Sequence, residues 1–216
     1  MIDRHDNVFE GILGPEPEWL TCACGALCAR TPCWDCDRAA MALVDAARLR
    51  GAAIATIPKH YAWALAGAPD LKTRVKLASP LADVIKRVLG ATRVVFVGAS
   101  GSGKTSLACA CLRERVPHGV FQTAFRLGLA RQQAALGQGE PAIVETALNA
   151  KLLLLDELGG EAKTATNAVR DIIFARHDAD MPTWITTGFT SSQIAETYGD
   201  GALRRMLEDA YVVKLG

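Results

Sequence analysis

The pattern of apolar and polar positions changes near Thr92, where an irregular first part gives way to regularly alternating short and long segments. The short segments are continuous apolar runs, which predict strands at 93–97, 120–124, 152–155, 183–187 and 210–215. The long segments carry apolar residues at helical spacing and predict helices at 103–114, 126–136, 140–150, 164–179, 191–197 and 201–208. Strands that alternate with helices favour an α/β fold, in which a parallel five-stranded sheet has helices on both faces.

The first part of the chain has no such alternation. Residues 1–20 predict an irregular lead-in, and the alanine-rich segment 38–50 predicts a short helix that ends near Gly51. Prolines and a glycine are spread through residues 52–78, so we interpret this segment as a linker with short helical turns.

One amphipathic helix precedes the regular part. Ser79 resembles a helix N-cap with Pro80 at the first helical position, and the helix that follows ends at Gly90. Its apolar residues share one face at helical spacing, which indicates packing against a core. We therefore divide the chain into an N-terminal module (1–50), a linker (51–78) and an α/β domain (79–216).

Composition narrows the class of protein. Half of the 216 residues are hydrophobic and 22% are charged, which suffices for a substantial buried core. The formal net charge of +1 means that any contact with nucleic acid must come from local patches. No apolar run approaches the roughly 20 residues that span a bilayer, and residues 1–6 lack the apolar core of a signal peptide. We expect a cytoplasmic protein with no membrane partner.

The strongest motif lies at residues 98–105, which fit the nucleotide-phosphate loop pattern G-x-x-x-x-G-K-[ST] between a predicted strand and a predicted helix. Glycines let the backbone curl around phosphate groups, so that N–H groups point at them from a helix N-terminus. Lys104 would reach the β- and γ-phosphates, and the Thr105 hydroxyl would bind Mg²⁺. The residues expected to bind ATP in this loop are Gly98, Gly101, Ser102, Gly103, Lys104, Thr105 and Ser106.

A second motif, about 50 residues downstream, indicates hydrolysis. The apolar run 152–155 is followed by Asp156, which would hold Mg²⁺ through its water shell, and by Glu157. Glu157 would polarise the attacking water, which is hydrolysis rather than transfer to a bound acceptor. The alternative is a buried strand that ends in a solvated acidic turn. Together the two motifs predict an ATPase that uses ATP and Mg²⁺.

Five of the seven cysteines lie between residues 22 and 36, and in a cytosolic chain such a cluster indicates metal rather than disulfides. Four thiolates form the usual closed tetrahedral site for structural Zn²⁺. The expected ligands are Cys22, Cys24, Cys33 and Cys36, and Cys28 could replace Cys22 or be a spare. A redox or iron–sulfur role and ordinary free thiols remain as alternatives.

The chain resembles the AAA+ ATPases of the DnaC and IstB type, which are helicase loaders and transposition helper ATPases. Besides the phosphate loop, the resemblance rests on residues 57–61, 149–159 and 198–208, and it covers residues 55–216. It implies an AAA+ core without a C-terminal helical lid, since the sequence ends shortly after the last predicted strand.

The family also implies a further catalytic residue, an arginine finger that acts just before the last strand. The match places Arg205 at this position, with Arg204 beside it. An arginine fork suits phosphate oxygens, and a neighbouring subunit can supply it to stabilise charge on the γ-phosphoryl group. The alternative is a solvated helix on which Glu208 pairs with Arg205.

The sequence departs from the family after the predicted strand 183–187. The family often has an asparagine there that senses the γ-phosphate, and this chain has Gly188. Thr187 or Thr186 could substitute, because a hydroxyl can orient a water or a phosphate oxygen, or both could merely satisfy the strand end. We therefore expect slow hydrolysis, with ATP acting mainly as a switch.

The resemblance implies a DnaC-like helicase loader, because the cysteine-rich N-terminus is more similar to phage-type loaders. Its partners would be a replicative helicase, single-stranded DNA and further copies of the chain, which associate through the ATP site. One alternative is an IstB-like transposition helper ATPase that acts on duplex DNA. Another is an adaptor that binds ATP without hydrolysing it.

Overall fold

The structure is a computed structural model that describes residues 20–29, 31–115, 119–135 and 137–216. The chain divides after Ala47 into two compact units. In the first unit, β1 (Leu20–Thr21) and β2 (Leu27–Cys28) pair as an antiparallel hairpin. The lead-in was predicted for residues 1–20, of which 1–19 lie outside the described residues and Leu20 begins β1. No helix in the described part of the chain is long and apolar enough to cross a membrane.

Helix α1 runs from Trp34 to Thr56, so the predicted end near Gly51 is wrong. A single glycine costs only about 1 kcal/mol relative to alanine in a helix, and alanines follow Gly51 directly. The last residue of the helix already belongs to the second unit, where the Thr56 hydroxyl accepts a hydrogen bond from the Phe121 amide at 2.9 Å.

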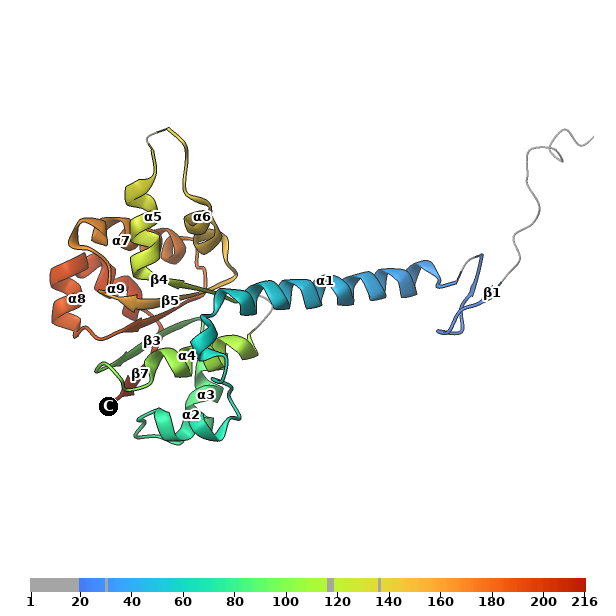
Figure 1. Ribbon diagram of the computed structural model, residues 1–216, viewed down its shortest axis with the longest axis horizontal. Helices are drawn as coiled ribbons and strands as arrows, with labels where there is room; N and C mark the ends of the chain where they lie inside the picture. The colour runs from blue at the N-terminus through green and yellow to red at the C-terminus, as the bar shows by residue number, and fades with distance from the viewer. Residues whose placement is uncertain (1–19, 30, 116–118, 136) are drawn as a thin grey trace, which may run out of the picture. The chain divides into compact units, whose positions relative to one another are not determined.

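The second unit is built on the predicted five-stranded parallel sheet, with the order β4-β5-β6-β3-β7 (Figure 1). Its strands are β3 (Arg93–Gly98), β4 (Gly119–Thr123), β5 (Leu152–Leu158), β6 (Thr183–Thr187) and β7 (Ala210–Leu215). The fold prediction is confirmed. Strands β3 and β5, which carry the two motifs, each pair in parallel with β6, which lies between them. Their carboxyl ends therefore lie at the same edge of the sheet.

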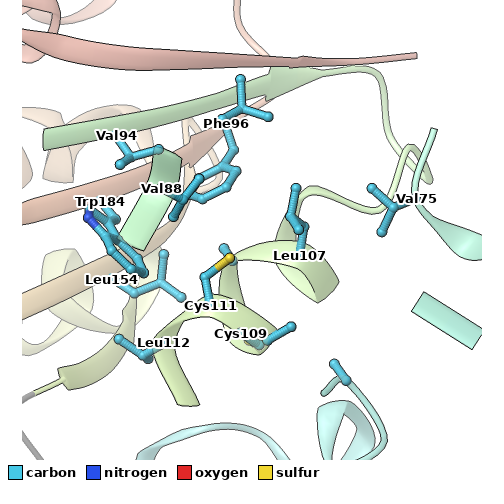
Figure 2. Close-up of a cluster of buried hydrophobic side chains, with 14 of the residues drawn as sticks. Val75, Val88, Val94, Phe96, Leu107, Cys109, Cys111, Leu112, Leu154 and Trp184 are labelled. Atoms are coloured by element: carbon cyan, nitrogen blue, oxygen red, sulfur yellow. The ribbon is translucent and has the colours of Figure 1, made fainter. Parts of the chain in front are cut away.

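Helices cover both faces of this sheet (Figure 1). One face carries α3 (Leu81–Gly90) and α4 (Lys104–Glu114). The other face carries α5 (Ala124–Gln133), α6 (Ala142–Asn149), α7 (Thr166–Asp178), α8 (Ser191–Tyr198) and α9 (Asp200–Leu207). Figure 2 shows the core on the α4 face, where side chains from α3, α4 and the strands interlock around Phe96, Trp184 and Leu154. Every helix predicted after the phosphate loop is present within a few residues of its expected bounds.

The segment interpreted as a linker is part of this core. It contains η1 (Lys59–Tyr61) and α2 (Pro69–Arg74), and Ile57, Leu71 and Val75 are buried against the side chains of α4. Prolines and glycines gave the segment its irregular pattern, but Ile57, Ala64, Leu71 and Val75 are buried in the core, while Leu65 remains exposed. The segment therefore belongs to the core through long-range packing that its irregular pattern did not reveal.

The predicted cap of α3 is displaced by one residue. Pro80 and not Ser79 is the N-cap, and its carbonyl accepts hydrogen bonds from Asp83 and Val84. The extended ψ of 131° at Pro80 keeps this residue outside the helix.

Candidate active site and metal centre

The loop between β3 and α4 requires glycine for close backbone approach. A Cβ at Gly98 would lie 2.1 Å from the carbonyl oxygen of Leu215, and one at Gly103 would lie 2.7 Å from that of Arg74. Gly103 also has a φ of +90°, which side chains rarely allow, and it is the N-cap of α4. The loop is therefore clamped between β7 and the segment around α2, with the N-terminus of α4 at its end.

Lys104 begins α4 and folds back over the loop. Its ammonium group donates hydrogen bonds to the carbonyls of Gly98 (2.7 Å) and Ala99 (2.8 Å). Partial burial lowers the pKa of Lys104, while the nearby charges of Asp156 and Glu157 raise it. The structure therefore brings a partly desolvated cation to the end of the motif strands, where phosphate groups would lie.

Thr105 and Asp156 meet although they are 51 residues apart. The Thr105 hydroxyl donates to Asp156 Oδ1 at 2.8 Å, and the Thr186 hydroxyl donates to the same oxygen at 2.6 Å. Asp156 is only 6% exposed, and burial raises the pKa of its carboxyl group against the effect of these two hydrogen bonds. A hydroxyl and a carboxylate are the hard oxygen ligands that Mg²⁺ prefers, so Thr105 and Asp156 fit the expected ion.

Glu157 has an unusual backbone conformation. Strand β5 continues past its predicted end to Leu158, but its register against β6 shifts after Leu155. Glu157 has a φ of +58°, and its amide donates to the Thr186 hydroxyl at 2.9 Å. A left-handed conformation costs a non-glycine residue about 1–2 kcal/mol, so the surroundings must hold it in place. The side chain remains exposed and lines the same cleft as Lys104.

Thr187, expected as a substitute sensor, has a buried hydroxyl with partners on both sides. It donates to the carbonyl of Leu158 at 2.9 Å and accepts from the amide of Phe189 at 3.0 Å. This arrangement holds the ends of β5 and β6 together. The hydroxyl that contacts the acidic pair is that of Thr186, so the catalytic role of Thr187 stays a prediction.

Part of the phosphate loop, the acidic pair and the two threonines at the end of β6 line one cleft of about 790 Å³. From the phosphate loop, the cleft is lined by Gly101, Gly103, Lys104, Thr105 and Ser106. Among the described residues, Gly98 and Ser102 belong to the loop but do not line the cleft. Residues of the segment interpreted as a linker also line the cleft, and there the guanidinium of Arg74 lies 4.5 Å from the centre of the Trp63 ring. The sequence pattern does not predict that Trp63 and Arg74 line the cleft. Residues 57–61, which carry part of the family resemblance, contribute His60 and Tyr61 to the same lining.

Arg205 lies on α9, away from this cleft, whose lining within the described chain does not include it. Its Nε donates to Asp178 at 3.3 Å, and its guanidinium stacks on the ring of Phe174 at 4.1 Å. The pairing of Arg205 with Glu208 that the sequence allowed is not observed. Glu208 instead pairs with Arg204 at 3.1 Å and with His177 at 3.1 Å.

The cysteine segment forms a separate candidate metal centre. The sulfur atoms of Cys22, Cys24, Cys33 and Cys36 all lie within 4.8 Å of one another. Four sulfurs at about 2.3 Å from a tetrahedral Zn²⁺ would be about 3.8 Å apart, and two of the observed separations are 3.6 and 3.7 Å. Cys28 lies outside this group, since its thiol contacts the carbonyls of Leu20 and Ala26. The four grouped cysteines therefore fit zinc.

The local hydrogen bonds also favour a thiolate. The backbone amide of Cys33 donates to the Cys22 sulfur at 3.4 Å and, with the amide of Cys24, lowers the pKa of Cys22 to about 6. The neighbouring sulfurs raise the pKa of Cys36. Crowded thiols of this kind hold their charge best when a cation lies between them.

Comparison with known proteins decides the family. A family model described as IstB-like ATP binding protein matches residues 25–214. The chain belongs to this family. The match includes the phosphate loop and the Asp156–Glu157 pair, and it begins within the cysteine segment. No curated protein matches the sequence.

Solved structures support the fold of this IstB-like chain. The DnaC helicase loader is 22% identical with a TM-score of 0.58, over 74% of this chain and 100% of that one. DnaI is 19% identical with a TM-score of 0.51, over 62% of this chain and 82% of that one. AMPPCP-bound DnaA from Aquifex aeolicus is 17% identical with a TM-score of 0.51, over 62% and 44%. The predicted AAA+ core and the DnaC/IstB resemblance are thereby confirmed.

We expect about one zinc ion per chain in the purified protein, measured by elemental analysis. Ligating thiolates must be deprotonated, so occupancy should fall as the pH is lowered and when a strong chelator is added. Replacing Cys33 and Cys36 together with serine should remove the metal, while Cys28→Ser should leave it bound. A folded parent protein that contains no metal would contradict this assignment.

Proposed function

We propose that this IstB-like protein hydrolyses ATP and uses it to load a replicative helicase onto single-stranded DNA. One observation carries the ATPase part: Lys104, Thr105, Asp156 and Glu157 all line one cleft. The cleft has the size of a small-molecule site, which is about 300–1,000 Å³. Its chemistry, a cation and oxygen ligands beside a glycine loop, matches a nucleoside triphosphate with its magnesium ion.

In the proposed reaction, Lys104 exchanges its two carbonyl partners for oxygens of the β- and γ-phosphates. Thr105 and Asp156 would hold Mg²⁺, which would supply positive charge to offset that of the phosphates. Glu157 accepts a proton from the water that attacks the γ-phosphorus, and the bond to the ADP oxygen breaks. ADP leaves with the bonding electron pair, so the products are ADP and inorganic phosphate.

The base of the nucleotide would lie against residues 60–74, which belong to the segment interpreted as a linker. The Trp63 ring and the Arg74 guanidinium stack on each other at the rim of the phosphate cleft, together with His60 and Tyr61. Flat aromatic and guanidinium surfaces suit a purine, because stacking needs no particular pattern of hydrogen bonds.

The loader part of the proposal rests on two features. The DnaC helicase loader shares its fold with this chain over that protein's full length. The cysteine module belongs to a compact unit separate from the ATPase, and we propose that it binds the helicase. A second candidate, a transposition helper that acts on duplex DNA, is favoured by the IstB-like family match.

One experiment separates these candidates. ATP hydrolysis by the full chain is measured alone, with single-stranded DNA and with duplex DNA, and captured partners are identified from the native host. We expect stimulation by single-stranded DNA and capture of a replicative helicase. Stimulation by duplex DNA with capture of a transposase would favour the second candidate. A protein that binds ATP but shows no turnover in any arm would be an adaptor.

Arg205 should act across a subunit boundary, since it does not line the cleft of its own chain within the described residues. We expect Arg205→Ala to keep ATP binding but lose most of the hydrolysis that DNA or a partner stimulates. Mixing it with Lys104→Ala should restore some activity, because one chain then supplies the arginine and the other the intact loop.

The matched control is Arg204→Ala, which removes the exposed neighbour that pairs with Glu208. This variant should retain stimulated hydrolysis. If parent activity does not depend on protein concentration, and Arg205→Ala hydrolyses ATP like the parent, Arg205 only serves its own chain through Asp178 and Phe174.

A further inference from the structure

The left-handed conformation of Glu157 depends on the loop that follows it. The Gly160 amide donates to the Glu157 carbonyl at 2.8 Å, which closes a tight turn directly after the acidic pair. Gly159 has a φ of +99°, and a Cβ there would lie 2.6 Å from the ring of Phe189. The turn is thus pressed against Phe189, and small shifts in it would move Glu157.

A buried carboxylate holds this turn from beneath. Glu161 is 8% exposed, and its Oε2 accepts a hydrogen bond from the Gly159 amide at 3.1 Å. Its other oxygen, Oε1, accepts a hydrogen bond from the hydroxyl of Tyr198, which is 3% exposed at the end of α8. Buried carboxylates are costly unless each oxygen has a donor, and both oxygens of Glu161 have one.

Two helices fix the position of Glu161. On the α5 side, a Cβ built on Gly128 would lie 3.5 Å from the Glu161 Cβ, so the two backbones approach closely. On the other side, Tyr198 belongs to the same core cluster as Ala202 and Met206 of α9. Helix α9 also carries Arg205. A continuous set of contacts therefore runs from the helix of the proposed finger to the turn at Glu157.

Neither residue lines the cleft within the described part of the chain, so neither would touch the nucleotide. We propose that Glu161 and Tyr198 are positioning residues that hold Glu157 in place and connect its turn to α8 and α9. This inference rests on the proposed ATPase function. Misplacement of a catalytic group by about 1 Å can cost on the order of a hundredfold in rate, so such support affects turnover far more than binding.

The test compares variants of the full-length chain by kcat, KM and the affinity for a fluorescent ATP analogue. Glu161→Ala removes both hydrogen bonds, and we expect kcat to fall on the order of tenfold while ATP affinity stays within about twofold. Tyr198→Phe removes only the hydroxyl and keeps the ring in the core, so kcat should fall about threefold. Glu161→Gln can still bond to both partners and should retain most of the parental kcat.

Two further variants make the result specific. Ile194→Val shortens another buried side chain of α8 and should leave kcat unchanged. The double variant with Glu161→Ala and Tyr198→Phe should be no slower than Glu161→Ala alone, because both changes break the same network. Circular dichroism and thermal unfolding establish that each variant is folded, and Tyr198→Phe serves if Glu161→Ala is not.

The failures are distinguishable. If folded Glu161→Ala or Tyr198→Phe keeps the parental kcat, the inference is overturned while the ATPase proposal stands. It is also overturned if kcat and ATP affinity fall together, and in proportion to lost stability, as a merely structural role would require. If the parent protein hydrolyses no ATP, the proposed function fails and this inference with it.

Discussion

Lys104→Ala is expected to lower the affinity for ATP at least about tenfold, because a hydrogen bond to a charged group contributes about 1.5–3 kcal/mol. Among the residues that the structure describes, the Lys104 ammonium bonds only to carbonyls of its own loop, at Gly98 and Ala99. Its removal therefore breaks no contact between distant elements. The fold should remain intact, and titration with a fluorescent ATP analogue measures the loss.

Lys151→Ala is the matched control for this substitution. Lys151 is an exposed lysine just before β5, and it is outside the cleft lining. It should bind ATP like the parent. An unchanged ATP affinity in folded Lys104→Ala would mean that residues 98–105 do not bind the phosphates.

Glu157→Gln should abolish turnover and spare binding. The amide keeps the size of the side chain but cannot accept the proton of the attacking water, and general bases contribute about 10²–10⁴-fold to rate. The backbone bond from the Glu157 amide to Thr186 and the turn closed by Gly160 do not involve the side chain, so they should persist. Phosphate release measures hydrolysis, and equilibrium binding measures ATP affinity.

Glu145→Gln on α6 changes an exposed carboxylate outside the cleft lining and should hydrolyse ATP at the parental rate. A Glu157→Gln variant that does the same would assign the base to another residue. Hydrolysis that disappears together with ATP binding would instead mean that Glu157 contributes to the ground-state complex.

Local sequence signals predicted the framework of the nucleotide site. The phosphate loop is contiguous, and its glycines lie within a few residues of one another, so the motif is visible in one short stretch of sequence. The acidic pair follows an apolar run, so its place near the carboxyl end of a buried strand was visible from its own neighbours, although β5 continues to Leu158. The order of elements along the chain then sufficed for a parallel sheet with both motif strands ending at one edge.

Contacts between distant segments were not visible in this way. Thr186 and Thr187 are adjacent, and only the pairing of β6 with the irregular end of β5 decides which hydroxyl reaches Asp156. Side chains alternate between the two faces of a strand, so a shift of one residue exchanges their roles. The role of the segment interpreted as a linker was also not visible in the sequence, because Trp63 and Arg74 reach the cleft through the packing of Leu71 and Val75 in the core.

Arg176 illustrates the difference between what the local sequence suggests and what the tertiary structure shows. In the sequence it is one of several cations near the end of the helix predicted at 164–179, a position that usually faces solvent. In the structure it is 1% exposed and donates to the carbonyls of Ala147, Leu148, Ala150 and Pro182. It thereby satisfies the orphan carbonyls at the end of α6, which no local pattern announces.

The sequence by itself therefore determined the alternating elements, the parallel sheet, the phosphate loop and the acidic pair, because each depends on residues close together in the chain. The tertiary structure decided which four cysteines converge, which threonine contacts Asp156, and how Glu161 and Tyr198 support Glu157. The contacts of Thr186 with Asp156 and of Tyr198 with Glu161 join residues far apart in sequence. They exist only because burial of the two apolar faces of the sheet brings the helices to fixed positions.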